Sequence, residues 1–227
     1  MNEMTQSLYK QRLRLTFAKK SDIKYISHLD LALLWERALR RARLPLGYSQ
    51  GFNPRPKIQI ASGLPLGTSG TAEILDMLLT EPVNPDEALE RIRPTLPLGV
   101  ALYSVEEVPL KAAALQQLLH RADYRVLVET DLPAETLRQR INDLLAAEQI
   151  IQTRRRRKQE ETYDLRPWLY ELRLAGLAEG VAHLHMQLAA GQSGNLRPQE
   201  VLKVLGLADN WVDLERTRLI FDNEASN

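Results

Sequence analysis

The side chains best suited to binding chemistry are concentrated between Tyr25 and Lys57. Arg37, Arg40 and Arg41 follow one another at spacings of three and four residues, which places them on one face of a helix. A guanidinium offers a planar set of donors that fits phosphate or carboxylate. This face therefore predicts an anion-binding site, and the alternative is a solvated helix face without a ligand.

A loop rich in glycine, proline and polar side chains follows these arginines, from Leu44 to Lys57. Two glycines and three prolines among its fourteen residues favour fixed turns over a flexible linker. Aromatic side chains in such a loop can stack on a nucleobase, and basic ones can contact phosphate. The alternative for the two aromatic residues is that they anchor the loop on a sheet. The predicted ligand or RNA site comprises Arg37, Arg40, Arg41, Tyr48, Ser49, Gln50, Phe52, Asn53, Arg55 and Lys57, and we expect Arg37, Arg41, Tyr48, Ser49, Asn53 and Arg55 to converge on one pocket.

The charge distribution favours a polyanionic partner. Residues 1–60 hold twelve Lys and Arg against four Asp and Glu, a balance of +8, whereas the whole chain has a formal net charge of +1. A local excess of this size can attract RNA. A second basic run extends to Lys158 and predicts contacts to an RNA backbone from Arg154, Arg155, Arg156 and Arg157. Its alternative is a solvated arm balanced by the glutamates that follow.

Signs of catalysis are weak. His28 stands at the predicted start of the helix, where a neutral imidazole can act as a general base, and it is the one weak catalytic candidate. Its alternatives are a ligand contact and a structural hydrogen bond. His183 and His185 share a face of a predicted strand without further ligands, so no metal site is predicted. The chain has no cysteine, no P-loop and no G-x-G-x-x-G, which leads us to expect no cofactor.

The helix that carries the arginines is predicted over Ser27–Leu44. Ser27 is a candidate N-cap with Asp30 three residues later, an Asp version of the capping box. Apolar residues at spacings of three and four predict its buried stripe. The stripe comprises Ala32, Trp35, Leu39 and Ala42, with Leu29 and Leu33 beside it.

Alternating and apolar runs predict the same order of elements in both halves of the chain. The first half has strands at Leu13–Lys19, Lys57–Ala61, Ala72–Leu79 and Val100–Val108, and a second helix at Pro85–Arg93. The second half has strands at Tyr124–Thr130, Trp168–Ala175, Val181–Leu188 and Val212–Phe221, helices at Ala134–Glu148 and Arg197–Leu205, and extra strand material at Ile150–Lys158. We therefore predict an α+β protein of two tandem ferredoxin-like (βαββαβ) domains, residues 1–110 and 111–227, each an antiparallel sheet with helices on one face.

The stretch SHLDLALLWERALRRARLPLGYSQGFNPRPKI, followed by LPLGTSGTAEILD, resembles the bacterial radical-SAM-linked family catalogued as domain of unknown function 2344. The resemblance covers most of the chain and is strongest from Arg14 to Asp76. It is carried by Ser27–Asp30, Arg37–Arg41, Tyr48–Pro54, Leu64–Gly67 and Glu73. It implies an accessory module beside a radical-SAM protein with a B12-binding-like region. Since this chain has no cysteine, any radical chemistry would belong to that partner.

These observations predict an accessory, non-catalytic module that binds tRNA or rRNA and works with a radical-SAM enzyme. One alternative is a protein–protein docking module for that partner, and another is a metal-independent ribonuclease or RNA-modifying subunit using His28. We expect no DNA partner. No apolar run approaches the roughly 18–20 residues of a membrane helix, and no signal-peptide pattern is evident, so a cytoplasmic location without a membrane partner is expected.

Overall fold

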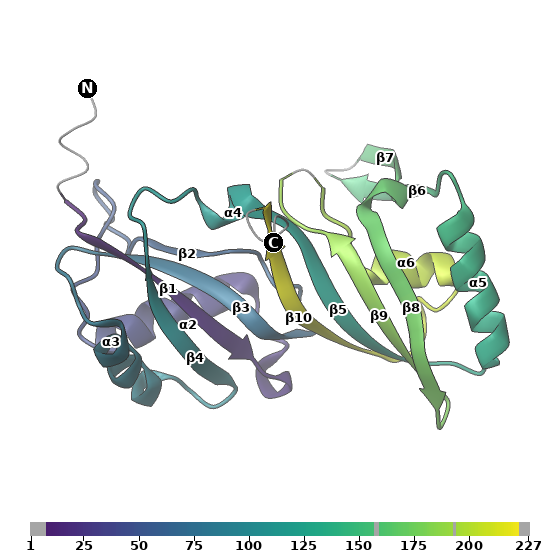
Figure 1. Ribbon diagram of the computed structural model, residues 1–227, viewed down its shortest axis with the longest axis horizontal. Coiled ribbons are helices and arrows are strands. Elements are labelled where there is room, and N and C mark those ends of the chain that lie inside the picture. Colours follow the sequence, from purple (N-terminus) through teal and green to yellow (C-terminus); the bar gives the residue numbers. More distant parts are fainter. Residues whose placement is uncertain (1–7, 157–158, 193, 223–227) are drawn as a thin grey trace. The chain divides into compact units, whose positions relative to one another are not determined.

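The computed structural model describes residues 8–156, 159–192 and 194–222 (Figure 1). The chain is a mixed α+β protein with mostly antiparallel strands, as predicted. By its contacts it divides into two compact units, Met1–Leu119 and His120–Asn227. The connection after residue 110, which the sequence assigned to the second half, thus makes its contacts with the first unit.

The sheet of the first unit has the strand order β4-β1-β3-β2. Strand β1 pairs antiparallel with both β3 and β4, and β2 pairs antiparallel with β3. The elements are β1 (Gln11–Lys19), α2 (His28–Arg41), β2 (Ile58–Ile60), β3 (Thr68–Leu79), α3 (Pro85–Ile92) and β4 (Val100–Val108), with short helices η1 (Ser21–Ile23), η2 (Arg93–Thr95) and α4 (Leu115–Leu118). All predicted elements of this half are confirmed, with shifted ends, whereas α4 was not anticipated.

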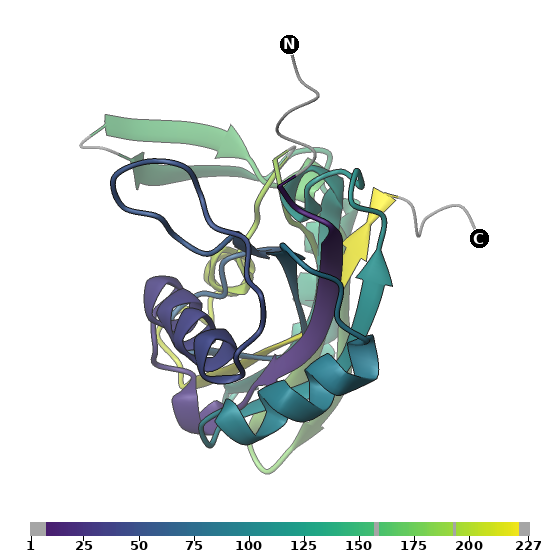
Figure 2. The ribbon, with the colours of Figure 1, turned by 90° about the vertical axis from the view of Figure 1, so that its left-hand side faces the viewer.

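Helix α2 begins at a capping box. The Ser27 hydroxyl accepts a hydrogen bond from the Asp30 N–H at 3.1 Å, and the Asp30 carboxylate accepts one from the Ser27 N–H at 3.4 Å. Trp35 then packs edge-on against Phe17 of β1, with ring centroids 4.8 Å apart. Figure 2 shows α2 and α3 beside the same face of this unit's sheet, where the apolar core lies.

The buried stripe of α2 differs from the predicted one. Leu31, Trp35, Ala38 and Leu39 are its buried residues. Leu29 is 74% exposed and Leu33 is 42% exposed, although both were expected beside the buried stripe. Apolar residues occupy more than one face of this helix, so spacing alone does not tell which face meets the sheet. The outcome is a helix with an apolar row left at the surface.

The second unit repeats the strand order of the first, as β10-β5-β9-β8. Strand β9 pairs antiparallel with β5 and β8. Strand β10 runs opposite to β5, because the Glu129 N–H donates to Trp211 O and the Thr217 hydroxyl donates to Asp123 O. The elements are β5 (Leu119–Glu129), α5 (Ala134–Ala146), β8 (Leu169–Ala178), β9 (Val181–Ala189), α6 (Pro198–Leu205) and β10 (Val212–Phe221).

Both units place their longest connection between the first helix and the second strand. In the first unit this is the stretch from Ala42 to Lys57, which includes the 44–57 loop. In the second unit it contains a hairpin, β6 (Ile151–Arg156) with β7 (Gln159–Asp164), and then η3 (Arg166–Trp168). Strand β6 was predicted, whereas β7 was expected to be an irregular charged stretch.

Candidate functional site

A groove of about 460 Å³ lies in the first unit between α2, β2 and α4. Leu29, Ala32 and Leu33 of α2 form one apolar wall, and Ile58 and Ile60 of β2 form the other. The polar residues that line it are His28, Glu36, Arg55, Gln59 and Gln116. Apolar walls with a few polar groups are typical of small-ligand sites.

The 44–57 loop is held in place by its own backbone and by β3. The Gly47 N–H donates to Leu78 O at 2.7 Å, and the Leu78 N–H donates to Lys57 O at 3.0 Å, so one residue of β3 binds both ends of the loop. Nearer the tip, the Ser49 N–H donates to Arg55 O at 2.8 Å, and the Arg55 N–H donates to the Ser49 hydroxyl at 3.0 Å. The loop is thus a fixed frame, as its Gly and Pro content predicted, and it brings Arg55 to the groove.

The three arginines of α2 have different surroundings. Arg40 pairs with Glu36 at 2.8 Å and lies over the Tyr48 ring, 5.8 Å from its centroid. Arg41 donates to the carbonyl of Thr95 at 2.5 Å. Arg37 is exposed and has no hydrogen-bond or ion-pair partner within the described part of the chain. Helical spacing placed the arginines together but could not show which of them are engaged by groups distant in sequence.

The predicted convergence of six residues on one pocket is not found. Of those six, Arg55 lines the groove, and the others lie along α2 or on the loop outside it. At the tip, Phe52 is fully exposed and thus does not anchor the loop, whereas Tyr48 is half-buried. The remaining predicted loop residues, Gln50, Asn53 and Lys57, are also exposed.

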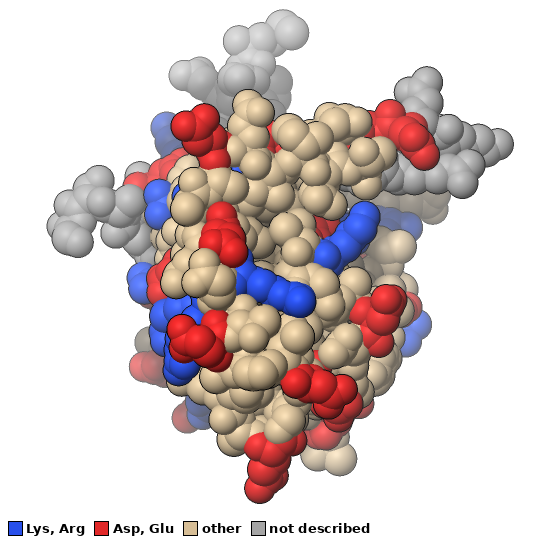
Figure 3. Space-filling view, turned by 90° about the vertical axis from the view of Figure 1, so that its right-hand side faces the viewer, with Lys and Arg blue, Asp and Glu red and all other residues tan. Residues whose placement is uncertain are grey.

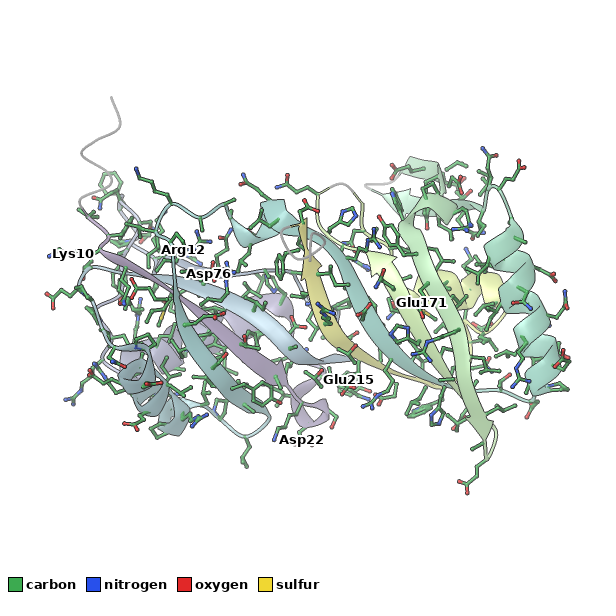
Figure 4. The ribbon with its side chains drawn as sticks, in the orientation of Figure 1. Lys10, Arg12, Asp22, Asp76, Glu171 and Glu215 are labelled. Atoms are coloured by element: carbon green, nitrogen blue, oxygen red, sulfur yellow. The ribbon has the colours of Figure 1, made fainter. Side chains whose placement is uncertain are left out.

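A buried charge cluster supports the sheet beneath the loop. Asp76 of β3 accepts hydrogen bonds from Arg12 at 2.8 and 2.5 Å and from Arg14 at 2.8 and 3.0 Å. Figure 4 shows Arg12 and Asp76 on the neighbouring strands β1 and β3. Arg12 also donates to the carbonyls of Ala112 and Ala113, which fixes the connection that leads to α4 and Gln116.

This cluster reduces the positive charge that the first sixty residues present to solvent. Arg12 is buried, Arg14 is largely buried, and both face the Asp76 carboxylate. Lys19 is 1% exposed and donates to the carbonyls of Lys24 and Ile26. The excess of +8 counted from the sequence is therefore not all a surface charge, because several of its cations lie inside the unit.

His28 is the first residue of α2 and lines the groove from an exposed position. A Cβ atom placed on Gly63 would lie 3.6 Å from its ring. Among the residues described, its imidazole has no hydrogen-bond partner. The structure thus gives His28 access to a ligand but no neighbour that would orient it as a general base.

In the second unit, the hairpin places its arginines opposite acidic or amide residues. The register pairs Arg154 with Glu161, Arg155 with Glu160 and Arg156 with Gln159. Arg157 lies outside the described residues. On the face of this unit that Figure 3 displays, basic and acidic side chains are interspersed without a large patch of one sign.

The two histidines of β9 lie on the same side of the strand, and one of them is close to a carboxylate. His185 Nδ1 lies 3.5 Å from the carboxylate of Glu171, which is labelled in Figure 4. His183 and His185 share the face that alternates with the buried side of the strand. In the described ranges, no group of three or more His, Cys, Asp or Glu residues is arranged to hold a metal ion.

Three polar residues of the groove are not among the predicted site residues: Glu36, Gln59 and Gln116. Glu36 stands four residues before Arg40, and that spacing is a recognisable signal for an ion pair. Gln59 and Gln116 carry no local signal, because they meet only through the fold.

The helices seen in the described residues do not include one long and apolar enough to span a bilayer.

Comparison with solved structures shows a likeness of fold. A chain of the "Cbf5-Nop10-Gar1 Complex" matches with a TM-score of 0.51 and 14% identity, over 96% of this chain and 51% of the other. A chain from the "Structure of H/ACA RNP bound to a substrate RNA containing 2'-deoxyuridine" matches with a TM-score of 0.49 and 14% identity, over 96% and 50%. This chain spans about half the length of each.

No curated protein matches the chain in sequence. A family model does match, over residues 12–198, which include α2, α3, the 44–57 loop and most of the second unit. The model is described as an uncharacterized protein conserved in bacteria. The match covers far more than half of the 227 residues, and the chain therefore belongs to the family of domain of unknown function 2344.

Proposed function

We propose that the chain is an accessory, non-catalytic module that binds tRNA or rRNA through α2 and the 44–57 loop. The observation that carries this proposal is Phe52, an aromatic side chain held fully in solvent at the tip of an ordered loop. A ring in this position is available to stack on an unpaired base, a contact worth about 1–3 kcal/mol.

The surroundings of Phe52 suit an RNA strand. Arg55 and Lys57 follow it on the same loop, both exposed, and the loop contains no Asp or Glu. Arg37 adds a further exposed cation on α2. Stacking on bases combined with cations for the backbone is the usual means of binding single-stranded nucleic acid.

We also propose a domain architecture and a protein partner for this chain. The strand order β4-β1-β3-β2, repeated as β10-β5-β9-β8, supports two tandem ferredoxin-like domains. The radical-SAM protein with a B12-binding-like region is proposed as partner from the resemblance of the sequence alone, and a cytoplasmic location goes with it. A catalytic role for His28 has no further support in the geometry.

Protein docking is a second candidate function with its own observation. Leu29 and Leu33 are exposed one helical turn apart on α2, and Tyr25, four residues earlier, is 71% exposed. Exposed apolar residues in a row are characteristic of protein–protein contacts. This surface supports a contact between the module and a protein partner.

Fluorescence anisotropy with labelled tRNA and rRNA fragments at two salt concentrations tests the RNA proposal. We expect binding that weakens with salt and weakens further in Arg55→Ala/Lys57→Ala, because both cations would contact phosphates. The matched control is Arg138→Ala/Arg173→Ala, two exposed arginines of the second unit, and it should bind as the wild type. Absence of binding at low salt, or an equal loss in the control, contradicts the proposal.

A further inference from the structure

The orientation of two amides in the groove follows from their hydrogen bonds. Gln116 Nε2 donates to the carbonyl of Ile60 at 2.7 Å, and a carbonyl can only accept. The amide oxygen of Gln116 is therefore the atom that accepts from Gln59 Nε2. In this arrangement the amide nitrogen of Gln59 points toward Gln116. The amide oxygen of Gln59 takes no part in the bond to Gln116.

Glu36 adds a carboxylate to the same groove. Its Oε1 pairs with Arg40 at 2.8 Å, and the side chain is 23% exposed, so it is partly shielded and still accessible. Arg40 in turn lies over the half-buried Tyr48 ring, which limits where the pair can move. A carboxylate held in this way can accept from two parallel donors on a ligand.

Glu36 thus brings an acceptor to the groove, and the edge of a ligand that meets this carboxylate must present donors. Among the RNA bases, guanine has two adjacent donors on its Watson–Crick edge, N1–H and the N2 amino group. Adenine and cytosine set an amino group beside an acceptor, and uracil has one N–H between two carbonyls. A carboxylate matches the guanine edge alone among the four.

The size and the walls of the groove fit a base. Its volume of about 460 Å³ lies within the range of ligand pockets. Its lining includes Ala32 and Leu33 of α2 together with Pro56 and Ile58 of the loop and β2, so apolar side chains from different elements are available to contact a flat ring. Arg55, at the loop end of the groove, supplies a cation for the attached phosphate.

We propose that this groove binds the guanine base of an RNA nucleotide and that Glu36 selects guanine. The inference rests on the proposed RNA-binding function and adds the base that the site recognises. It also assigns a role to Glu36, Gln59 and Gln116, of which the last two have no recognisable signature in the sequence.

Calorimetric titration of the full chain with GMP, AMP, CMP and UMP tests this assignment, because the four ligands carry the same phosphate. We expect GMP to bind about tenfold or more tightly than the other three. Glu36→Gln should remove this preference by weakening GMP about tenfold while leaving AMP unchanged. The matched control is Glu87→Gln, which alters the corresponding i,i+4 pair with Arg91 on α3 and should keep the preference.

A second variant, Ala32→Phe, fills the groove and should abolish GMP binding, with circular dichroism confirming that the chain remains folded. Equal affinities for the four nucleotides, or a guanine preference that survives Glu36→Gln, overturns the assignment. Titration with poly(U) separates it from the proposed function. If poly(U) binds and GMP is not preferred, the guanine site fails and RNA binding stands. If GMP is preferred and neither poly(U) nor tRNA binds, RNA binding fails and the groove is a site for free nucleotides.

Discussion

The two units have the same strand order, yet they differ in the connection between the first helix and the second strand. In the first unit this connection is the 44–57 loop, which contains Arg55 and Lys57 and no acidic residue. In the second unit it contains the hairpin, where Arg154 and Arg155 stand opposite Glu161 and Glu160. The sequence shows more arginine in the hairpin than in the loop. In the hairpin, glutamates lie opposite two of the arginines in register, whereas the loop has no acidic residue of its own to pair with Arg55 and Lys57.

The two connections also differ in what holds them. The loop is bound to Leu78 at both ends and crosslinked by Ser49, so its shape depends on β3. The hairpin is held by pairing between its own strands and by Tyr163 of β7, whose hydroxyl donates to the Glu200 carboxylate and whose ring stacks on Trp168. The loop is therefore expected to depend on the charge cluster within the sheet of its unit, where Asp76 lies two residues from Leu78.

The largest expected effect is the loss of stability when the buried charge cluster in the sheet beneath the loop is broken. Asp76→Ala leaves the guanidiniums of Arg12 and Arg14 without their carboxylate in a buried site, and we expect the free energy of unfolding to fall by about 3–5 kcal/mol. Urea denaturation followed by circular dichroism measures this loss. Asp131→Ala, at an exposed carboxylate of the second unit, is the control and should change stability by less than about 0.5 kcal/mol. A loss below about 1 kcal/mol for Asp76→Ala would show that the cluster does not support the sheet.

The next largest effect is on RNA affinity, which we compare between variants of the loop and variants of the hairpin. Arg55→Ala/Lys57→Ala should lower affinity for an rRNA fragment by about tenfold or more and reduce the slope of log K against log salt by about 2. Arg154→Ala/Arg155→Ala removes as many cations and should lower affinity by less than about threefold, because glutamates stand across from both. Anisotropy titrations at several salt concentrations distinguish the pairs. A larger loss in the hairpin variant would reverse the comparison.

A smaller effect is expected from the tip of the loop. Phe52→Ala should weaken RNA binding about fivefold to tenfold through the loss of stacking on one base. The melting temperature should stay unchanged, because the side chain makes no buried contacts. Tyr103→Ala, at a half-exposed ring on β4, serves as the control for loss of an aromatic surface. If Phe52→Ala melts earlier and binds RNA normally, the ring has a structural role.

The smallest effect concerns the first helix of each unit. Helix α2 has a capping box at Ser27, whereas α5 has Pro133 at its N-cap position and no side-chain capping hydrogen bond. Ser27→Ala should lower the free energy of unfolding by about 1 kcal/mol. Pro133→Ala removes no capping hydrogen bond and is the matched comparison in chemical denaturation. Equal effects would mean that the cap contributes nothing specific to α2.

Much of the fold could be predicted from the sequence because local residue patterns encode its helices and strands. The alternation of apolar and polar residues in β1 and the Ser27–Asp30 cap of α2 could both be predicted without tertiary information, and the structure confirms them. The buried face of α2 was not, since Leu29 and Leu33 have the same apolar character as the buried residues. The groove was less predictable still. Gln116 reaches it from α4, more than fifty residues along the chain from Gln59, and no local pattern encodes that meeting.

The most direct test of the central claim is a map of backbone amide chemical shifts during titration of the full chain with a single-stranded rRNA fragment. We expect perturbed amides within α2 and from Leu44 to Ile60, and unperturbed amides in the hairpin strands β6 and β7. Perturbations confined to the hairpin, or none in α2 and the loop at saturating RNA, would contradict it.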